Sequence, residues 1–189
     1  DKKLFLEIAT LNAKENLKQH LLSSFTKKIQ LECIQKTLAL SSIPEVMECF
    51  DVSHTMGKET TASCVVFEKG LPKISKYRQF NIKNIRPGDD YAAINQAVYR
   101  RYSGLLKSNK AMPDIVFIDG GLGQLNQAIT VMNSIGIDNI QLVGIAKDSS
   151  RKAGLETLIT IENDKVNRIN LTPHDPALLL INHIRDESH

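Results

Sequence analysis

The chain has 189 residues, a mass of 21.1 kDa, 42% hydrophobic residues and 24% charged residues. A chain of this length and composition can bury a core without disulfides or structural zinc, and it is neither disordered nor collagen-like. Its longest apolar stretches, residues 115–118 and 177–181, are far shorter than the roughly 20 residues that a membrane span requires, so a membrane protein is excluded.

The net charge of +3 is unevenly distributed. Residues 68–110 contain ten Lys and Arg and three Asp and Glu, whereas residues 111–189 contain six and ten. A basic segment of this kind is either a solvated face or a binding site for a polyanion. Cations and aromatic side chains are interleaved at residues 76–78 and 99–102, a pairing that phosphate contacts and base stacking use.

The three cysteines, Cys33, Cys49 and Cys64, are odd in number and have no Cys-x-x-Cys spacing. At least two of them lie in runs typical of buried strands, which indicates reduced thiols and favours a cytoplasmic protein. The chain begins at Asp1 and stops at His189 within a predicted helix. We therefore expect a fragment of a longer protein.

The first forty residues contain neither Pro nor Gly and are rich in helix formers. Their apolar residues predict one long amphipathic helix, or a pair, that starts near Thr10 or Asn12 and ends before Pro44. We expect residues 1–44 to pack on, or bridge to, a separate domain formed by residues 45–189. The apolar positions are Leu17, Leu21, Phe25, Ile29, Ile34 and Leu38.

The next part of the chain has the pattern of β-strands. Residues 46–52, 60–68 and 73–83 are predicted strands, joined by short links that contain Gly57 and Gly70. Three consecutive strands with such links predict an antiparallel meander. The residues of the third strand expected to face inward are Ile74, Phe80 and Ile82.

The second half alternates helices and strands, which implies parallel strands added to the meander. The fold class expected is therefore α/β, a mixed sheet flanked by helices. A hairpin and a closing helix follow, with Asp175 as the N-cap of that helix and Pro176 at its first position. The predicted elements are a helix from 89 or 90 to 107, a strand over 115–119, a helix over 123–135, a strand over 141–147, a hairpin over 155–171 and a helix over 176–189.

Two aspartates stand at the ends of apolar strands. Asp51 lies at the end of the first strand, and Asp119 precedes Gly120 and Gly121, which let backbone approach a ligand closely. Strand-end aspartates are ordinary turn residues, but a buried carboxylate needs a hydrogen bond, a charged partner or a metal. If the two strands are parallel neighbours, both carboxylates share one rim of the sheet and suit Mg²⁺ or Mn²⁺.

His189 lies on the same stripe of the last helix as Ile181 and Arg185. A lone His at a helix end is usually a surface residue, but together with Asp51 and Asp119 it would complete a nuclease site. There the metal activates water and stabilises phosphoryl oxygens, while His189 orients or deprotonates the nucleophile.

Other interpretations stay open. Residues 119–124 could be a phosphate-cradling loop of a nucleotide-binding enzyme, although they lack the Gly-x-Gly-x-x-Gly register and a Walker lysine. The domain could also bind nucleic acid without catalysis. Asp89 is the simplest N-cap for the helix that follows, yet Asp89 or Asp90 could add an outer metal contact. His54 and His174 are interpreted as polar loop residues.

Six motifs in unbroken order resemble the UvrC family, the incision subunit of the bacterial excinuclease. The resemblance covers about residues 46–189, and the leading helices are also similar. It implies a ribonuclease H-like fold and a nuclease that cuts a damaged DNA strand on the 5′ side of the lesion. The motifs are residues 50–57, 62–67, 77–82, 88–91, 118–121 with 123–125, and 184–189.

The resemblance implies roles for individual residues. The family's metal-binding aspartate falls on Asp51, its second acidic residue on Asp119 and its helix histidine on His189. Another acidic residue needed for this cut falls on Asp90, although the spacing leaves Asp89 as an alternative.

The resemblance also implies Mg²⁺ or Mn²⁺ as cofactor, damaged double-stranded DNA as substrate, and UvrA and UvrB as partners in the wider system. The family's other nuclease domain, its UvrB-binding segment and its helix-hairpin-helix part lie outside this chain, so we expect a domain that keeps the metal site but binds DNA weakly. Nothing in the sequence demands a dimer, and we expect a monomer. Leu122 replaces a Lys that is common in the family, which removes one cation near the site. The residues expected to contact the DNA backbone are Arg78, Arg100, Arg101 and Lys147.

Overall fold

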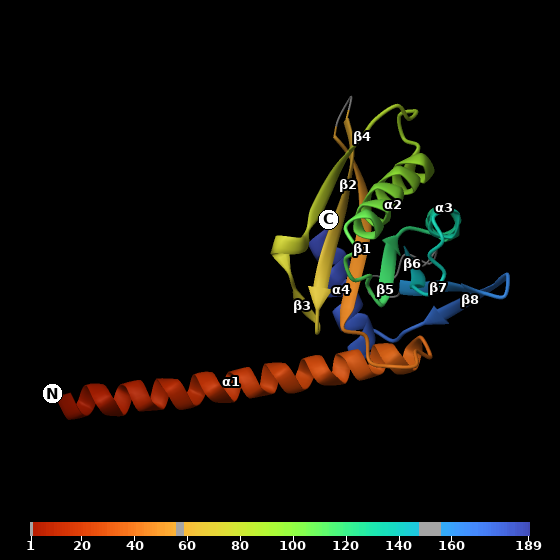
Figure 1. Cartoon of the computed structure of the whole chain (residues 1–189). Helices are drawn as coiled ribbons and strands as arrows, with labels where there is room; N and C mark the ends of the chain where they lie inside the picture. Colours follow the sequence, from red (N-terminus) through yellow and green to blue (C-terminus); the bar gives the residue numbers. More distant parts are fainter. Residues whose placement is uncertain (1, 56–58, 148–155) are drawn as a thin grey trace.

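A computed structural model describes residues 2–55, 59–147 and 156–189 of the chain, and a mixed eight-stranded sheet organises them. The strand order is β3-β2-β1-β5-β6-β7-β8, and β4 pairs with β2 (Figure 1). The elements are α1 (Lys2–Thr37), β1 (Val46–Thr55), β2 (Glu59–Glu68), β3 (Leu71–Pro72), a 3₁₀ turn η1 (Ile74–Lys76), β4 (Arg78–Ile82), α2 (Asp90–Lys107), β5 (Ile115–Asp119), α3 (Leu122–Ser134), β6 (Gln141–Lys147), β7 (Glu156–Glu162), β8 (Lys165–Asn170) and α4 (Pro176–Ser188).

The sheet combines antiparallel and parallel strands in the predicted order. β1 pairs antiparallel with β2, and β2 pairs antiparallel with β3 and β4. β1, β5 and β6 are parallel, and β7 and β8 then extend the sheet as an antiparallel hairpin. In the β1–β5 register Phe50 lies opposite Ile118, which brings Asp51 level with Asp119. The predicted mixed sheet and the parallel contact between these two strands are confirmed.

The sheet separates two hydrophobic layers. Side chains alternate between its faces, so Met47 and Cys49 of β1 pack toward α4 and the end of α1, whereas Phe50 packs toward α2 and α3. In Figure 1, α4 lies behind the sheet and α2 in front of it. The alternation directs Asp51 and Asp119 to the α4 face, because each lies two residues beyond a side chain of that layer.

The predicted third strand is wrong in its first half. Phe80 and Ile82 are buried as predicted, but Ile74 is 71% exposed and lies in η1. The chain pairs with the end of β2 through β3, and only after η1 does it pair again, through β4. The turn inserts extra residues between the two pairings and carries Ile74 out of the sheet, a change that strand propensity does not predict.

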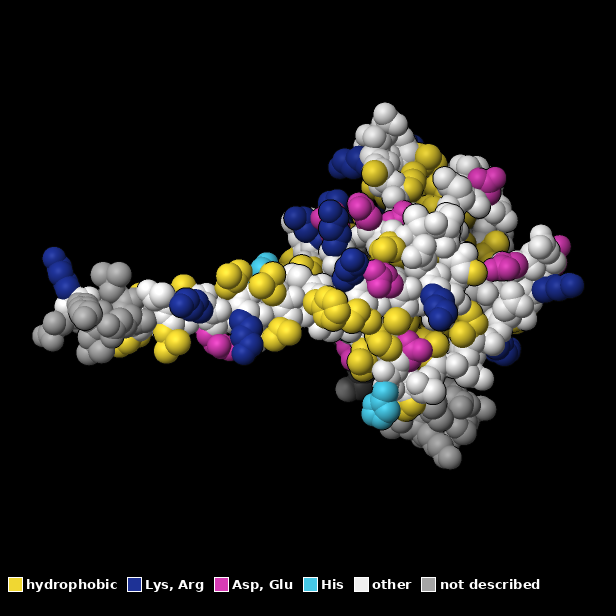
Figure 2. All heavy atoms as spheres, turned by 90° about the horizontal axis from the view of Figure 1, so that it is seen from below, with side chains coloured by type: hydrophobic (Ala, Val, Ile, Leu, Met, Phe, Trp, Pro, Cys, Tyr) yellow, Lys and Arg dark blue, Asp and Glu magenta, His cyan; other side chains and the backbone are white. Residues whose placement is uncertain are grey.

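α1 is one continuous helix, one of the two predicted possibilities. Leu31 and Ile34 near its C-terminal end, and Leu38 directly after it, pack in the layer that contains α4. The rest projects from the domain, and Figure 2 shows apolar side chains along the projecting part. Leu17 and Phe25, expected to pack, are 59% and 63% exposed. A domain boundary at residue 44 stays a prediction. No helix in the described ranges is both long and apolar enough to cross a membrane.

A buried polar network joins α2 to the sheet. Glu48 of β1 is 2% exposed; its Oε1 lies 2.5 Å from Nη2 of Arg101, and its Oε2 accepts a hydrogen bond of 2.8 Å from the Tyr102 hydroxyl. The Cys64 thiol also donates to Glu48 Oε2, at 3.5 Å. The network gives the carboxylate a charged partner in a region from which water is excluded.

Stability is expected to decrease at alkaline pH. Burial raises the pKa of the Cys49 thiol from 9.0 to about 12, and burial together with the nearby Glu48 raises that of Cys64 well above 9.0. Above about pH 9 the unfolded chain therefore releases protons that the folded protein retains, and the free energy of unfolding falls by up to about 1.4 kcal/mol per pH unit for each thiol. Urea unfolding across this range measures the slope. Cys49→Ala should make it shallower, and a flat wild-type profile would contradict the prediction.

Candidate metal centre

Asp51, Asp119 and His189 form a compact cluster at one rim of the sheet, which we call the acidic–histidine cluster. His189 Nδ1 lies 3.3 Å from Oδ2 of Asp51, and its Nε2 lies 3.0 Å from Oδ2 of Asp119. One potential ligand atom from each residue lies within 4.8 Å of the others. The sequence prediction that these three residues come together is confirmed as geometry.

The donor set fits a hard divalent cation. Two carboxylates supply the oxygen ligands that Mg²⁺ and Mn²⁺ prefer, and an imidazole lies beside them. The Asp51 side chain is 12% exposed and that of Asp119 is 11% exposed, whereas that of His189 is 48% exposed. The carboxylates are therefore shielded while the histidine side of the cluster opens to solvent, from which a phosphodiester can approach.

Polar contacts to the end of α4 hold His189 in place. The Ser63 hydroxyl of β2 donates a hydrogen bond of 2.6 Å to the carbonyl of Ser188, the residue before His189. The Tyr77 hydroxyl donates to Glu187 Oε1 at 3.1 Å, and Arg185 forms an ion pair with Glu156 of β7. The sequence analysis missed these supporting residues, because a serine or tyrosine in a strand region gives no local signal of a partner more than a hundred positions away.

The glycine loop after Asp119 supports the start of α3. Gln124 Oε1 accepts a hydrogen bond of 3.0 Å from the amide of Gly121, so one amide that a phosphate loop would offer is already paired. A Cβ at Gly120 would lie 2.7 Å from the Gln124 side chain, so a larger residue there would require that side chain to shift. Leu122 is half-buried and packs against the layer of α2 and α3.

Asp89 and Asp90 have different roles. Asp89 is the N-cap of α2, since its Oδ1 accepts a hydrogen bond of 3.0 Å from the Ala92 amide. Asp90, predicted to be catalytic, lies outside the acidic–histidine cluster, and its Oδ1 is 2.6 Å from Nε2 of His54. The interpretation of His54 as a loop residue is wrong, because it lies in β1 with its Nδ1 3.0 Å from the Thr60 hydroxyl.

The four residues expected to contact DNA differ in exposure. Arg101 is not available to a DNA phosphate, because its side chain is only 9% exposed and is paired with Glu48. Arg78 and Arg100 are exposed; Arg78 donates to the carbonyl of Tyr77, and Arg100 lies over the Phe80 ring at 5.2 Å. The side chain of Lys147 lies outside the described residues.

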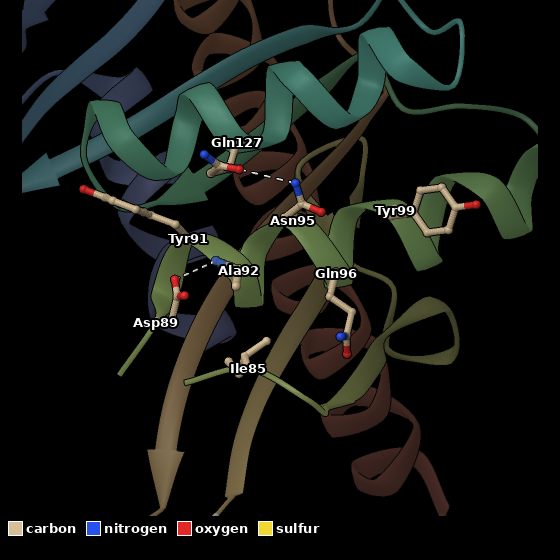
Figure 3. A pocket seen from close by; sticks show the side chains of 8 residues that line it. All are labelled: Ile85, Asp89, Tyr91, Ala92, Asn95, Gln96, Tyr99 and Gln127. Atoms are coloured by element: carbon tan, nitrogen blue, oxygen red, sulfur yellow. Dashed lines mark hydrogen bonds between the residues drawn. The ribbon is translucent and has the colours of Figure 1, made fainter. Parts of the chain in front are cut away.

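An open groove lies on the face of the sheet that α2 and α3 cover, opposite the face that carries α4. It runs between α2, α3 and the segment before α2. Figure 3 shows Tyr91 reaching from α2 toward α3, and Asn95 donating to Gln127 Oε1 at 3.3 Å. Amide side chains and tyrosines make up most of its lining. The carboxylate that lines it belongs to Asp89 and already caps α2. The groove therefore lacks the ligand set of the acidic–histidine cluster. Its lining residues are Ile85, Asp89, Tyr91, Ala92, Asn95, Gln96, Tyr99 and Gln127.

Comparison with solved structures finds distant likenesses. The catalytic domain of human endonuclease V matches with a TM-score of 0.43 and 14% identity, over 92% of this chain and 94% of that one. An Argonaute from Marinitoga piezophila matches with a TM-score of 0.36 and 10% identity, over 72% of this chain and 25% of that one. At these scores the likenesses carry no argument about the site.

Comparison with protein sequences is far more specific. UvrABC system protein C of Hydrogenovibrio crunogenus is 50% identical over 184 residues, which is 97% of this chain and 30% of the relative. The protein of the same name from Photorhabdus laumondii is 50% identical over 193 residues, 100% of this chain and 31% of the relative. The chain thus spans about 30% of the length of these relatives. The family model for the UvrC RNase H endonuclease domain matches residues 35–189, so the chain belongs to the UvrC RNase H endonuclease domain family.

Proposed function

We propose that this chain is a divalent-metal-dependent endonuclease domain that hydrolyses a DNA phosphodiester and makes the 5′ incision in nucleotide excision repair. The observation that carries the proposal is the convergence of Asp51, Asp119 and His189, with potential ligand atoms within 4.8 Å of one another. The membership in an endonuclease family supports the same reaction class.

Each residue of the acidic–histidine cluster has a distinct part in the proposed reaction. Asp51 and Asp119 hold Mg²⁺ or Mn²⁺ through their carboxylate oxygens. When bound, the ion stabilises the charge on the phosphoryl oxygens and activates water. His189 lies on the solvent side of the carboxylates, where an imidazole can orient the attacking water and accept its proton. The short contacts from this ring to both carboxylates limit its orientation.

The substrate proposed is damaged double-stranded DNA. Arg78 and Arg100 are the exposed cations proposed to contact its phosphates, and they lie in the segment with ten basic and three acidic residues. Two relatives carry the name of a UvrABC system protein, which supports UvrA and UvrB as partners of the whole protein. We propose that contacts with these partners involve regions of the whole protein that this chain does not span.

Metal removal is expected to abolish cleavage. Chelation with EDTA should stop cutting of a lesion-containing duplex by this domain, assayed within a full-length UvrC protein together with UvrA and UvrB. Mg²⁺ or Mn²⁺ should restore cutting, because the two carboxylates would hold the cation that stabilises charge on the phosphate. Anomalous diffraction from crystals of this chain soaked in Mn²⁺ gives a readout independent of activity, with a peak expected between Asp51 and Asp119. Cutting that persists in EDTA would contradict the proposal. DNA binding without cutting or metal binding would instead indicate a non-catalytic nucleic-acid-binding domain.

A further inference from the structure

The β1 strand continues past the metal centre without support from β5. The parallel register ends with Phe50 opposite Ile118, and in the described part of the chain β1 beyond that point pairs with β2 alone. Asp51 therefore lies where β1 becomes an edge. An edge segment that follows a metal-ligand position can shift relative to the neighbouring strand unless another element holds it.

One turn of helix contacts this segment. At the start of α2, Asp90 Oδ1 lies 2.6 Å from Nε2 of His54, three residues after Asp51 in β1. The other ring nitrogen of His54 is 3.0 Å from the Thr60 hydroxyl of β2, so the imidazole links α2 to both strands. The pair is 39% and 43% exposed, and a pair this exposed contributes little to global stability. Its effect is expected on local geometry.

The same turn also contacts the segment that follows Asp119. Tyr91, next to Asp90, lies so close to Gly123 that a Cβ at Gly123 would overlap the phenol group of Tyr91. Gly123 is the second residue of α3, four residues after Asp119. Residues 89–91 thus touch both chain segments that leave the metal centre, one after each carboxylate.

We propose that residues 89–91 form a positioning turn, and that His54 and Asp90 are positioning residues that act as one unit on the spacing of Asp51 and Asp119. The inference rests on the proposed nuclease function and deepens it. Asp90 acts through His54, not as a metal ligand or a group that contacts DNA. The loss of His54 or of Asp90 releases the same segment of β1, so either loss should change the spacing of Asp51 and Asp119 in the same way.

A double-mutant cycle tests this inference through Mn²⁺ affinity and cleavage. His54→Ala and Asp90→Ala are each expected to weaken Mn²⁺ binding or lower kcat by about tenfold, the range for residues that orient metal ligands. The double variant should lose about the same tenfold, because one unit is broken once. Calorimetric titration of this chain with Mn²⁺ gives the first readout. The second is kcat and KM, measured with the same variants within a full-length UvrC protein in the presence of UvrA and UvrB. His54→Gln retains a hydrogen-bond donor and should recover most of the loss.

The controls separate the possible explanations. Glu68→Gln breaks an exposed ion pair with Lys76 at the other end of β2 and should leave both readouts unchanged. If Asp90→Ala is severe and His54→Ala is silent or tightens Mn²⁺ binding, Asp90 acts directly and the inference is overturned. Additive losses, or unchanged affinity and kcat in all variants, also overturn it. If wild type fails to bind Mn²⁺, or Asp51→Asn binds it equally well, the proposed function fails instead.

Discussion

Asp51→Asn is expected to lower metal-dependent cleavage by about a thousandfold or more, which corresponds to about 4 kcal/mol of lost transition-state stabilisation. The substitution keeps the shape of the side chain but removes a charged oxygen ligand beside Asp119 and His189. Stability should not decrease, because Asp51 and Asp119 are like charges in a shielded place and neutralising one relieves their repulsion. Cleavage rate, Mn²⁺ titration and thermal unfolding, measured on the same preparation, check both parts.

A matched control uses a carboxylate far from the rim. Glu162→Gln neutralises an exposed residue at the end of β7 and is expected to cut at the wild-type rate. Asp119→Asn should resemble Asp51→Asn, and the double variant should be little worse than either, because both carboxylates are proposed to act in the same metal site. An Asp51→Asn variant that cuts at the wild-type rate would contradict the assigned role.

The second large effect concerns stability. Glu48→Gln is expected to lower the free energy of unfolding by about 3–5 kcal/mol, because it leaves the guanidinium of Arg101 in a buried place without its counter-charge. The geometry supports a large loss of stability, because Glu48 also accepts a hydrogen bond from the Tyr102 hydroxyl. Arg101 and Tyr102 both belong to α2, so Glu48 links this helix to the sheet. Urea unfolding of the wild type and the variant measures the difference, with cleavage at low temperature reporting whether the folded fraction remains active.

Replacement of both charges provides the control. Glu48→Met combined with Arg101→Met should be more stable than either single variant, because apolar side chains of similar volume leave no unpaired charge. Glu68→Gln, in an exposed ion pair, should change stability little. A loss below about 1 kcal/mol for Glu48→Gln would show that water or another group compensates the charge of Arg101.

Arg101→Gln should lower stability and leave the salt dependence of DNA binding unchanged.

Several features of the fold could be predicted from local patterns. Short runs of apolar and β-branched residues identified β1, β2, β5 and β6, and the change from consecutive strands to alternating helices and strands predicted the mixed sheet. Asp51 and Asp119 could be paired for the same reason, because parallel neighbours end at the same rim. His189 was harder, since a single turn of helix predicts the face on which a residue lies but not what that face meets. The combination with the two aspartates suggested a place for His189 in the site, and the resemblance to the UvrC family supported it.

The errors have a common origin. Arg101 looked like a cation for DNA because it stands in a basic, aromatic segment, yet it is buried against Glu48, 53 positions away. Asp90 and His54 were interpreted separately, although they are partners 36 positions apart. The alternation of apolar residues placed Ile74 in a strand, but Ile74 lies in the 3₁₀ turn η1. None of these outcomes is visible in a short window of sequence.

The sequence by itself determined the order and type of most of the elements and the presence of two strand-end carboxylates, since backbone geometry sets the periods of strands and helices and apolar residues follow them. Only the tertiary structure decided which charged groups are buried and which partners they have. The packing of α2 on the sheet removes Arg101 from solvent and brings Asp90 to His54, and the packing of α4 brings His189 to both aspartates. These pairings depend on how whole elements pack, because each joins residues that backbone periodicity does not relate.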